Sequence, residues 1–406
     1  MESIDANYDI FSVAICDDSA LMRNIVSRII NDTPGMKVVS KASNGRVLLE
    51  QLETGLNPDL IVLDIEMPVM SGVEFLKERK KRGIKTPVIV LSSIATKGAA
   101  VTMECLELGA SDFITKPGAS TTVDIVNVSD ELIEKIVAYG GIYGRRQGKR
   151  LPHTDYVMHM LKTLNAEKSV AKQKGEAFKT DKTEKPVFEP LKPVFSSFNE
   201  KKEPQVIVPA RDGGPIKIIA IGISTGGPNA LRDVFKMIDP HLKQPILVVQ
   251  HMPAGFTKEF AESLNKICPL TVHEAEDEMK IEDGHIYIAP GNYHIAVEKR
   301  AAGNVIRTNQ EPQRNGHRPS ADVLFESVAK VYKNNALGVI MTGMGRDGAA
   351  ELANLRKEGA WTLGQDEESC IVYGMPKVAF ELGGVQKQVG LMQMADEISK
   401  LAREHC

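Results

Sequence analysis

The sequence has no uncharged apolar run of the roughly 18 residues that a membrane-spanning helix needs. Its first ten residues are polar and acidic, without the apolar centre of a secretory signal. The net charge is only −3 over 406 residues, so no basic excess points to nucleic acid. These absences predict a cytoplasmic protein that neither inserts into membranes nor binds nucleic acid, and we expect a monomer.

Cysteine is scarce, and its five positions are scattered, odd in number and without metal-ligand spacing. We interpret them as reduced thiols that mostly pack in the interior. Apolar residues make up 42% of the chain and charged residues 25%, which is ordinary for a globular protein. The length accommodates two or three domains.

Residues 9–140 and 215–403 have the same hydrophobicity pattern, in which short apolar runs alternate with amphipathic stretches. Strands that alternate with helices predict parallel sheets covered by helices, so we expect two α/β domains. The expected strands are Phe11–Cys16, Leu60–Leu63, Val88–Leu91 and Asp112–Ile114 in the first domain, and Lys217–Ile221, Pro245–Gln250, His285–Ala289 and Leu337–Met341 in the second.

Residues 141–214 between these domains are rich in Lys, Glu and Pro, which predicts a flexible linker with at most a short helix near Asp155–Leu164. Two similar tetrapeptides, Lys185–Phe188 and Lys192–Phe195, stand inside it. They are either chance in a biased segment or a docking motif for a partner.

Acidic residues follow two strands of the first domain directly: Asp17 and Asp18 follow one strand, and Asp64 follows another. Open α/β sheets place their ligands at the carboxyl ends of strands. Carboxylates that converge there repel one another unless a cation intervenes, and Mg2+ prefers oxygen ligands. One carboxylate then becomes a nucleophile toward a phosphoryl donor. Ser92 and Lys116, at two further strand ends, suit contacts with a phosphoryl group.

These positions resemble the receiver domain of response regulators. The matching segments are Cys16–Ser19, Asp64–Pro68 with Gly72, Ser92-Ser93 and Lys116-Pro117. The resemblance implies a flavodoxin-like domain with a five-stranded parallel sheet and with Asp64 as the phosphoacceptor. It also implies Mg2+ held by Asp17, Asp18, Asp64 and the carbonyl of Glu66, with Ser92 and Phe113 as switch residues and Lys116 beside the phosphoryl group.

The segment Gly222–Gly227 has the Gly-x-Ser-x-Gly spacing of a nucleophile elbow between a strand and a helix. Its glycines permit a sharp turn that exposes the Ser224 hydroxyl. A phosphate-binding loop at a helix N-terminus is the competing interpretation. The absence of a Gly-Lys-Ser/Thr signature disfavours that alternative.

A histidine and an aspartate could complete the site around Ser224. His251 follows the next strand and suits a general base, although His285, His294 and His317 compete for that role. Asp347 lies in the glycine-rich segment Thr342–Gly348 and could orient the histidine. Backbone amides such as that of Met344 could bind an oxyanion. The order Ser, His, Asp differs from the Ser, Asp, His of α/β-hydrolases.

The second domain resembles the catalytic domain of chemotaxis protein-glutamate methylesterases, a doubly wound, mostly parallel α/β fold. The matching segments are Ile221–Pro228, Gln250–Thr257, Ala289–Gly291, His317–Phe325 and Thr342–Gly348. The resemblance implies Ser224 as nucleophile, His251 as base and Asp347 as its orienting partner. The oxyanion donors would be the amides of Met344 and Thr225, and this site would need no cofactor.

The combined resemblance implies hydrolysis of glutamate methyl esters, and deamidation of glutamines, on the cytoplasmic domains of chemoreceptors. A chemotaxis histidine kinase would supply the phosphoryl group, and the unphosphorylated receiver would cover the catalytic cleft. Two features depart from the expected pattern: the charged Arg346 beside Asp347, and a long linker. The alternatives are a receiver-linked esterase or amidase with another substrate, or a response regulator without enzymatic activity.

Overall fold

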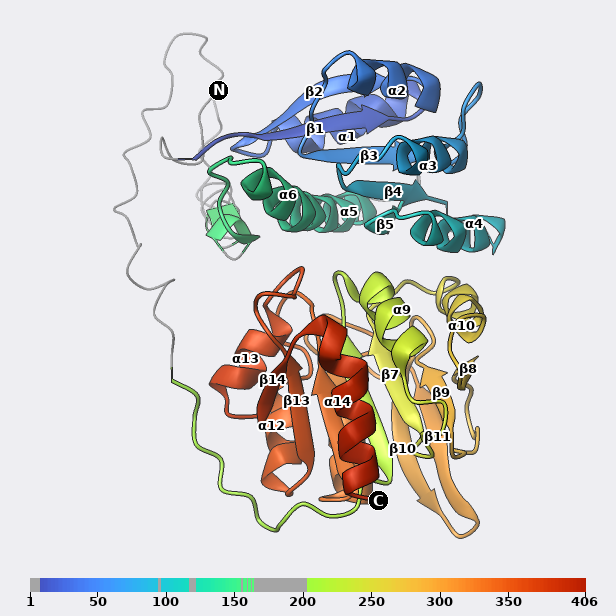
Figure 1. Cartoon of the computed structure of the whole chain (residues 1–406), viewed down its shortest axis with the longest axis vertical. Helices are drawn as coiled ribbons and strands as arrows, with labels where there is room; N and C mark the ends of the chain where they lie inside the picture. Colours follow the sequence, from blue (N-terminus) through green and yellow to red (C-terminus); the bar gives the residue numbers. More distant parts are fainter. Residues whose placement is uncertain are drawn as a thin grey trace.

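The computed structural model describes residues 8–93, 96–116, 122–154, 156–158, 160–161, 163 and 203–406. Within these ranges the chain forms two α/β domains that pack against each other (Figure 1). None of the helices in them combines the length and hydropathy that crossing a membrane requires. The two tetrapeptides at 185–188 and 192–195 lie outside the described residues, as does Pro117.

The N-terminal domain has one five-stranded parallel sheet in the order β2-β1-β3-β4-β5, which is the flavodoxin-like order. Its strands are β1 (Phe11–Cys16), β2 (Met36–Ala42), β3 (Leu60–Asp64), β4 (Val88–Ser92) and β5 (Asp112–Thr115). Its helices are α1 (Ala20–Asn31), α2 (Gly45–Glu53), α3 (Gly72–Lys81), α4 (Thr96–Glu107) and α5 (Thr122–Lys135). The predicted fold of this domain is confirmed.

Helical structure continues beyond α5 through a π-helical turn, η1 (Ile136–Gly140), into α6 (Gly141–Arg146). A side chain at Gly144 would lie 2.3 Å from the Leu151 side chain and 2.9 Å from Asp59, so this helix packs closely on the sheet. Lys149 also forms an ion pair with Asp59 at 2.7 Å. The chain therefore still packs on the N-terminal domain beyond residue 141, where the sequence predicts the linker to begin.

The C-terminal domain has a seven-stranded parallel sheet in the order β14-β13-β12-β6-β7-β9-β8, and a separate antiparallel hairpin of β10 and β11. Its strands are β6 (Ile218–Ile223), β7 (Ile246–Gln250), β8 (Thr271–Glu274), β9 (His285–Ile288), β10 (His294–Arg300), β11 (Gly303–Asn309), β12 (Ala336–Ile340), β13 (Trp361–Gln365) and β14 (Lys387–Val389). Its helices are α9 (Gly227–Met237), α10 (Thr257–Asn265), α11 (Ala321–Tyr332), α12 (Ala349–Lys357), α13 (Met375–Glu381) and α14 (Leu391–Glu404).

The strands β12, β6 and β7 lie side by side at the centre of this sheet, and every residue in them is buried. Ile223 pairs with Gln250, and Gly222 pairs with Ile340, so the three strands end at nearly the same level. The loops that follow them therefore begin together at one edge of the sheet. This register brings distant parts of the chain to a common site.

The segment before β6 forms backbone hydrogen bonds with the C-terminal domain. The amides of Gln205, Ala210 and Gly214 donate to carbonyls of Glu381, Lys357 and Asn334, respectively. Backbone hydrogen bonds therefore tie Gln205, Ala210 and Gly214, which the sequence predicts to belong to the linker, to this domain.

Candidate active site

Ser224 stands in a tight turn between β6 and α9. Gly226 adopts a left-handed conformation with φ of 84°, which a residue with a side chain rarely adopts. A side chain at Gly227 would lie 1.8 Å from the Gln250 amide oxygen, so it would displace the buried Gln250 side chain. The turn leaves Ser224 partly exposed at the carboxyl edge of the sheet. This is the strand–turn–helix context that the sequence predicts for an elbow.

Ser224, His251 and Asp347 form one hydrogen-bonded chain, although 96 residues separate the last two. The Nδ1 atom of His251 lies 3.1 Å from the Ser224 Oγ atom, and its Nε2 atom lies 2.8 Å from Asp347 Oδ2. The His251 side chain is 8% exposed and that of Asp347 is fully buried. The prediction that these three residues meet at one edge of the sheet is confirmed.

The three competing histidines have other surroundings. The ring of His294 is buried and bonds to the carbonyl of Pro312 and the amide of Ser320. His285 lies 3.8 Å from Glu282, away from Ser224. His317 stacks on the His251 ring, with centroids 3.8 Å apart. Among the described histidines, therefore, His251 is the one that bonds to Ser224.

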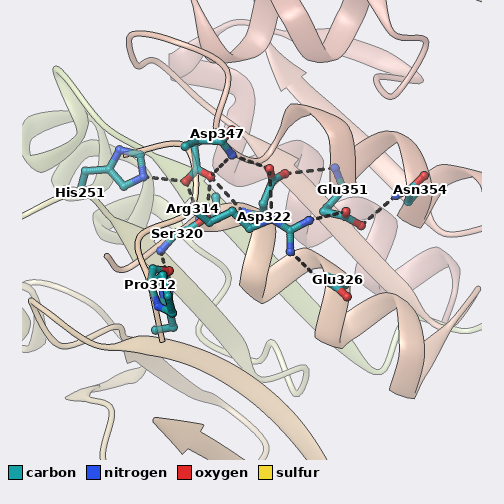
Figure 2. A network of polar contacts seen from close by, with 12 residues as sticks. His251, Pro312, Arg314, Ser320, Asp322, Glu326, Asp347, Glu351 and Asn354 are labelled. Carbon is teal, nitrogen blue, oxygen red and sulfur yellow. Dashed lines mark hydrogen bonds and ion pairs between the residues drawn. The ribbon is translucent and has the colours of Figure 1, made fainter. Parts of the chain in front are cut away.

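Asp347 sits at the N-terminus of α11 and accepts hydrogen bonds from that helix (Figure 2). The amide of Ala321 donates to Oδ2 at 2.6 Å, and the hydroxyl of Ser320 donates to Oδ1 at 2.6 Å. Asn315 donates to the same Oδ1 at 2.9 Å. Because Ser320 makes no side-chain cap of its own, Asp347 takes the place of the missing N-cap.

These donors explain the charge of Asp347. Burial opposes its ionisation, but hydrogen bonds from His251, Ser320 and Asn315 outweigh that penalty and hold its pKa well below the usual value. The carboxylate therefore stays ionised at neutral pH. An ionised partner at this place keeps the proton on Nε2 of His251 and leaves Nδ1 free to accept from Ser224.

A second buried carboxylate, Asp322, mirrors this arrangement. Asp322 lies in the first turn of α11, and its Oδ1 accepts from the Glu351 amide of α12 at 3.2 Å. Asp347, just before α12, caps α11, so each residue caps the other's helix. The amide group of Asn315 bridges them, 2.6 Å from Asp322 and 2.9 Å from Asp347. Burial and the neighbouring Asp347 raise the pKa of Asp322.

The outer end of the network is ionic. The Arg314 guanidinium contacts Glu326 of α11 and lies 2.7 Å from Glu351 of α12 (Figure 2). No role of Asn315, Ser320 or Asp322 was predicted from the sequence. A serine followed by an aspartate before an apolar helical pattern is an N-terminal signal that could have pointed to Ser320 and Asp322.

We expect Ser320→Ala to destabilise the C-terminal domain by about 2 kcal/mol, because it removes a buried hydrogen bond to a charged group. Urea unfolding followed by Trp361 fluorescence measures this, since Trp361 is the sole tryptophan and lies in β13. Asn354, exposed at the outer end of the same network, is the control: Asn354→Ala should change stability by less than about 0.5 kcal/mol. Equal effects of the two variants would contradict the expectation.

The loop after β12 packs directly on Ser224. The Ser224 amide donates to the Thr342 carbonyl at 2.9 Å, and a side chain at Gly343 would lie 2.7 Å from the Ser224 Cβ atom. Met344 follows in the same loop, and Thr225 directly follows Ser224. Their amides as oxyanion donors remain a prediction, which this close packing supports. Arg346 is exposed.

At the N-terminal domain, Asp17, Asp18 and Asp64 offer oxygens that all lie within 4.8 Å of one another. Lys116 Nζ lies 2.7 Å from Asp64 Oδ1 and 3.7 Å from Asp17 Oδ2. The Oδ2 atoms of Asp17 and Asp64 are buried and accept no hydrogen bond. Burial raises the pKa of both carboxyl groups, against the effect of Lys116. Orphaned carboxylate oxygens fit a hard cation such as Mg2+.

The two expected switch residues and Glu66 differ in their surroundings. The Ser92 hydroxyl is buried and lies 2.6 Å from the Thr102 hydroxyl of α4. Phe113 stacks on Phe256 of the C-terminal domain, with centroids 4.8 Å apart. The Glu66 side chain is exposed. Its carbonyl as a metal ligand remains a prediction, as do the switch roles.

The N-terminal domain contacts the residues next to Ser224. The Thr225 hydroxyl donates to Glu134 of α5 at 2.6 Å, and the Gly226 amide points to Asp112 of β5 at 3.4 Å. Asn229 of α9 donates to two carbonyls of the segment before β5 at 3.0 Å. The β5–α5 face of one domain therefore covers the turn that carries Ser224 in the other.

Comparison with known proteins agrees with both sites. The response regulator receiver domain family matches residues 13–126, and the CheB methylesterase family matches residues 219–398. A protein-glutamate methylesterase/protein-glutamine glutaminase of Treponema denticola is 52% identical over 97% of this chain and 98% of its own length. Its namesake in Treponema pallidum is 46% identical over 98% of both chains.

One solved structure, the CheB methylesterase catalytic domain of Thermotoga maritima, is 35% identical over 46% of this chain and 98% of its own, with a TM-score of 0.45. The identity and coverage of the full-length relatives are high enough to assign the family. The chain belongs to the protein-glutamate methylesterase/protein-glutamine glutaminase family, with a receiver domain followed by a CheB methylesterase domain.

Proposed function

We propose that this protein hydrolyses glutamate methyl esters, and deamidates glutamines, on the cytoplasmic domains of chemoreceptors, under control of its own receiver domain. The observation that carries the proposal is the hydrogen-bonded chain from Ser224 through His251 to Asp347. The names of the full-length relatives supply glutamate methyl esters and glutamines of proteins as the reacting groups, and the resemblance of the sequence supplies the chemoreceptors. A cytoplasmic location follows from that substrate.

In the reaction, the Ser224 hydroxyl attacks the ester carbonyl while His251 Nδ1 takes its proton. The amides of Met344 and Thr225 stabilise the oxyanion. His251 then gives the proton to the leaving methoxide, and methanol departs. Water, activated by His251, hydrolyses the acyl-enzyme and leaves a glutamate. With a glutamine substrate, ammonia is the leaving group.

Control of this reaction starts at Asp64, which takes a phosphoryl group from a chemotaxis histidine kinase. Asp17, Asp18 and Asp64 would hold Mg2+, which supplies neutralising charge for the transfer. Lys116 lies where it can pair with the added phosphoryl oxygens. Phosphorylation shifts the Ser92–Phe113 surface and weakens the contact of Phe113 with Phe256. The receiver then uncovers the turn that carries Ser224.

We expect Asp64→Ala to abolish stimulation by a small phosphodonor such as acetyl phosphate, while leaving the basal rate within about twofold of wild type. Methanol release from membranes with methylated chemoreceptors measures both rates. Asp32→Ala, at an exposed carboxylate after α1, is the control and should respond like wild type. An undiminished response of the Asp64 variant would contradict the control scheme.

The substrate assignment has its own test in the same assay. The wild-type protein could react at Ser224 with a serine-directed phosphonate and yet release no methanol from the membranes. That result would identify an esterase or amidase with another substrate. Absence of both reactions would favour a regulator without enzymatic activity.

A further inference from the structure

His317 lies directly against the proposed general base, on the loop between β11 and α11. Its ring is nearly parallel to that of His251, with an interplanar angle of 10° and centroids 3.8 Å apart. One face of the His251 ring is thereby covered, while its two nitrogens bond to Ser224 and Asp347. The stack leaves both of those hydrogen bonds in place.

The loop that carries His317 is held in one conformation. Arg314 and His317 exchange two backbone hydrogen bonds, of 3.1 and 3.0 Å, across Asn315 and Gly316. Both intervening residues have positive φ, 54° and 81°, as in a two-residue hairpin turn with an Asn-Gly sequence. The Arg314 side chain then ties this turn to α11 and α12. His317 is therefore pre-positioned rather than drawn in by substrate.

The charge state of His317 suits this place. Burial, and next the neighbouring His251, lower the pKa of His317 to about 4, against the attraction of Asp347. The two arginines of its own loop, Arg314 and Arg318, are engaged by α11, α12 and Asn292, and Glu311 of that loop is exposed. At neutral pH the ring is uncharged, so it does not repel the proton that His251 takes from Ser224.

We propose that His317 is a positioning residue for the reaction: its stacked ring fixes the plane of His251 toward Ser224 and keeps water from one face. This inference rests on the proposed role of His251 as base. It assigns to His317 neither proton transfer nor contact with the scissile bond. The ring surface carries the effect, so another aromatic ring should replace it.

The test uses the full chain with acetyl phosphate and measures the rate at which a serine-directed phosphonate labels Ser224, as a function of pH and phosphonate concentration. We expect His317→Ala to lower the maximal labelling rate by roughly tenfold, because a His251 ring that is not held toward Ser224 accepts its proton less efficiently. The phosphonate concentration that gives half of the maximal labelling rate should change by less than about twofold. The pH at which the labelling rate is half of its maximum, the pH midpoint, should rise, because water that reaches His251 favours the charged form of its ring. His317→Phe should restore the wild-type midpoint and most of the rate.

His405 offers a matched control. It stacks on Trp361 with centroids 4.0 Å apart, on a different part of the domain, so His405→Ala removes a similar stack without touching the triad. We expect wild-type labelling from that variant. Circular dichroism verifies that each variant is folded.

Two outcomes would overturn the proposal. The first is a His317→Ala variant whose rate and pH midpoint match wild type. The second is a His317→Phe variant as slow as His317→Ala, which would mean that ring nitrogens rather than the stack are needed. Labelling does not require a chemoreceptor, so failure of the proposed substrate leaves this test intact.

Discussion

Replacing Ser224 by alanine will lower the rate of methanol release from methylated chemoreceptors by about 10^6-fold, to the level left by binding and oxyanion contacts alone. The side chain is the one hydroxyl bonded to His251 in the described part of the chain, and it stands where the β6–α9 turn exposes it. Removing it leaves His251 with no nucleophile to activate. The rate is measured with acetyl phosphate present, so that the receiver does not limit it.

Covalent labelling gives an independent readout of the same residue. A serine-directed phosphonate should modify the wild-type protein at Ser224 and leave Ser224→Ala unmodified. Ser263 of α10, which is buried and donates to the Phe260 carbonyl, is the control, and Ser263→Ala should label like wild type. Labelling of Ser224→Ala at the wild-type rate would remove Ser224 from the mechanism.

The second large effect is expected from Asp347→Asn, which should lower kcat by about 10^4-fold with little change in KM. The Asp347 carboxylate accepts from His251, Ala321, Ser320 and Asn315 and donates to none. An asparagine brings an NH2 group into this ring of donors. If that group faces Nε2 of His251, the imidazole proton moves to Nδ1, and the base can no longer accept from Ser224.

Asp322→Asn is the matched control for that variant. Asp322 is also buried and belongs to the same network, in the first turn of α11, but it makes no hydrogen bond to His251. We expect its kcat to stay within about tenfold of wild type. A pH–rate profile of both variants separates loss of the base from loss of fold. An Asp347→Asn rate within tenfold of wild type would refute the orienting role.

The strands that build both sites could be predicted from sequence because they are buried on both faces. Such strands appear as continuous apolar runs, and β1, β6, β7 and β12 were each located within about two residues. Three strands at sheet edges, β2, β8 and β14, were missed, although β5 at the other edge of the N-terminal sheet was predicted. β2 alternates buried and exposed residues and contains Lys37 and Lys41, so its pattern resembles a surface segment.

The contacts that tune the triad could not be predicted in the same way. Asn315, His317 and Ser320 reach Asp347 and His251 only because a short hairpin turn folds the chain ahead of α11 back over the sheet edge. Which of the four candidate histidines bonds to Ser224 likewise depends on the tertiary structure. Sequence spacing does not show which ring faces Ser224.

The sequence by itself determined the family, the order of the two domains and the strand ends at which Ser224, His251 and Asp64 stand. These depend on local turn chemistry and on the rule that parallel strands share one carboxyl edge. Only the tertiary structure decided how Asp347 is kept ionised and how the receiver face reaches Thr225 and Gly226. The receiver contacts join segments about 90 or more residues apart, and the contacts of Asp347 join residues 26 to 96 apart. Both sets run through helix ends and loops, whose packing no periodicity in the chain encodes.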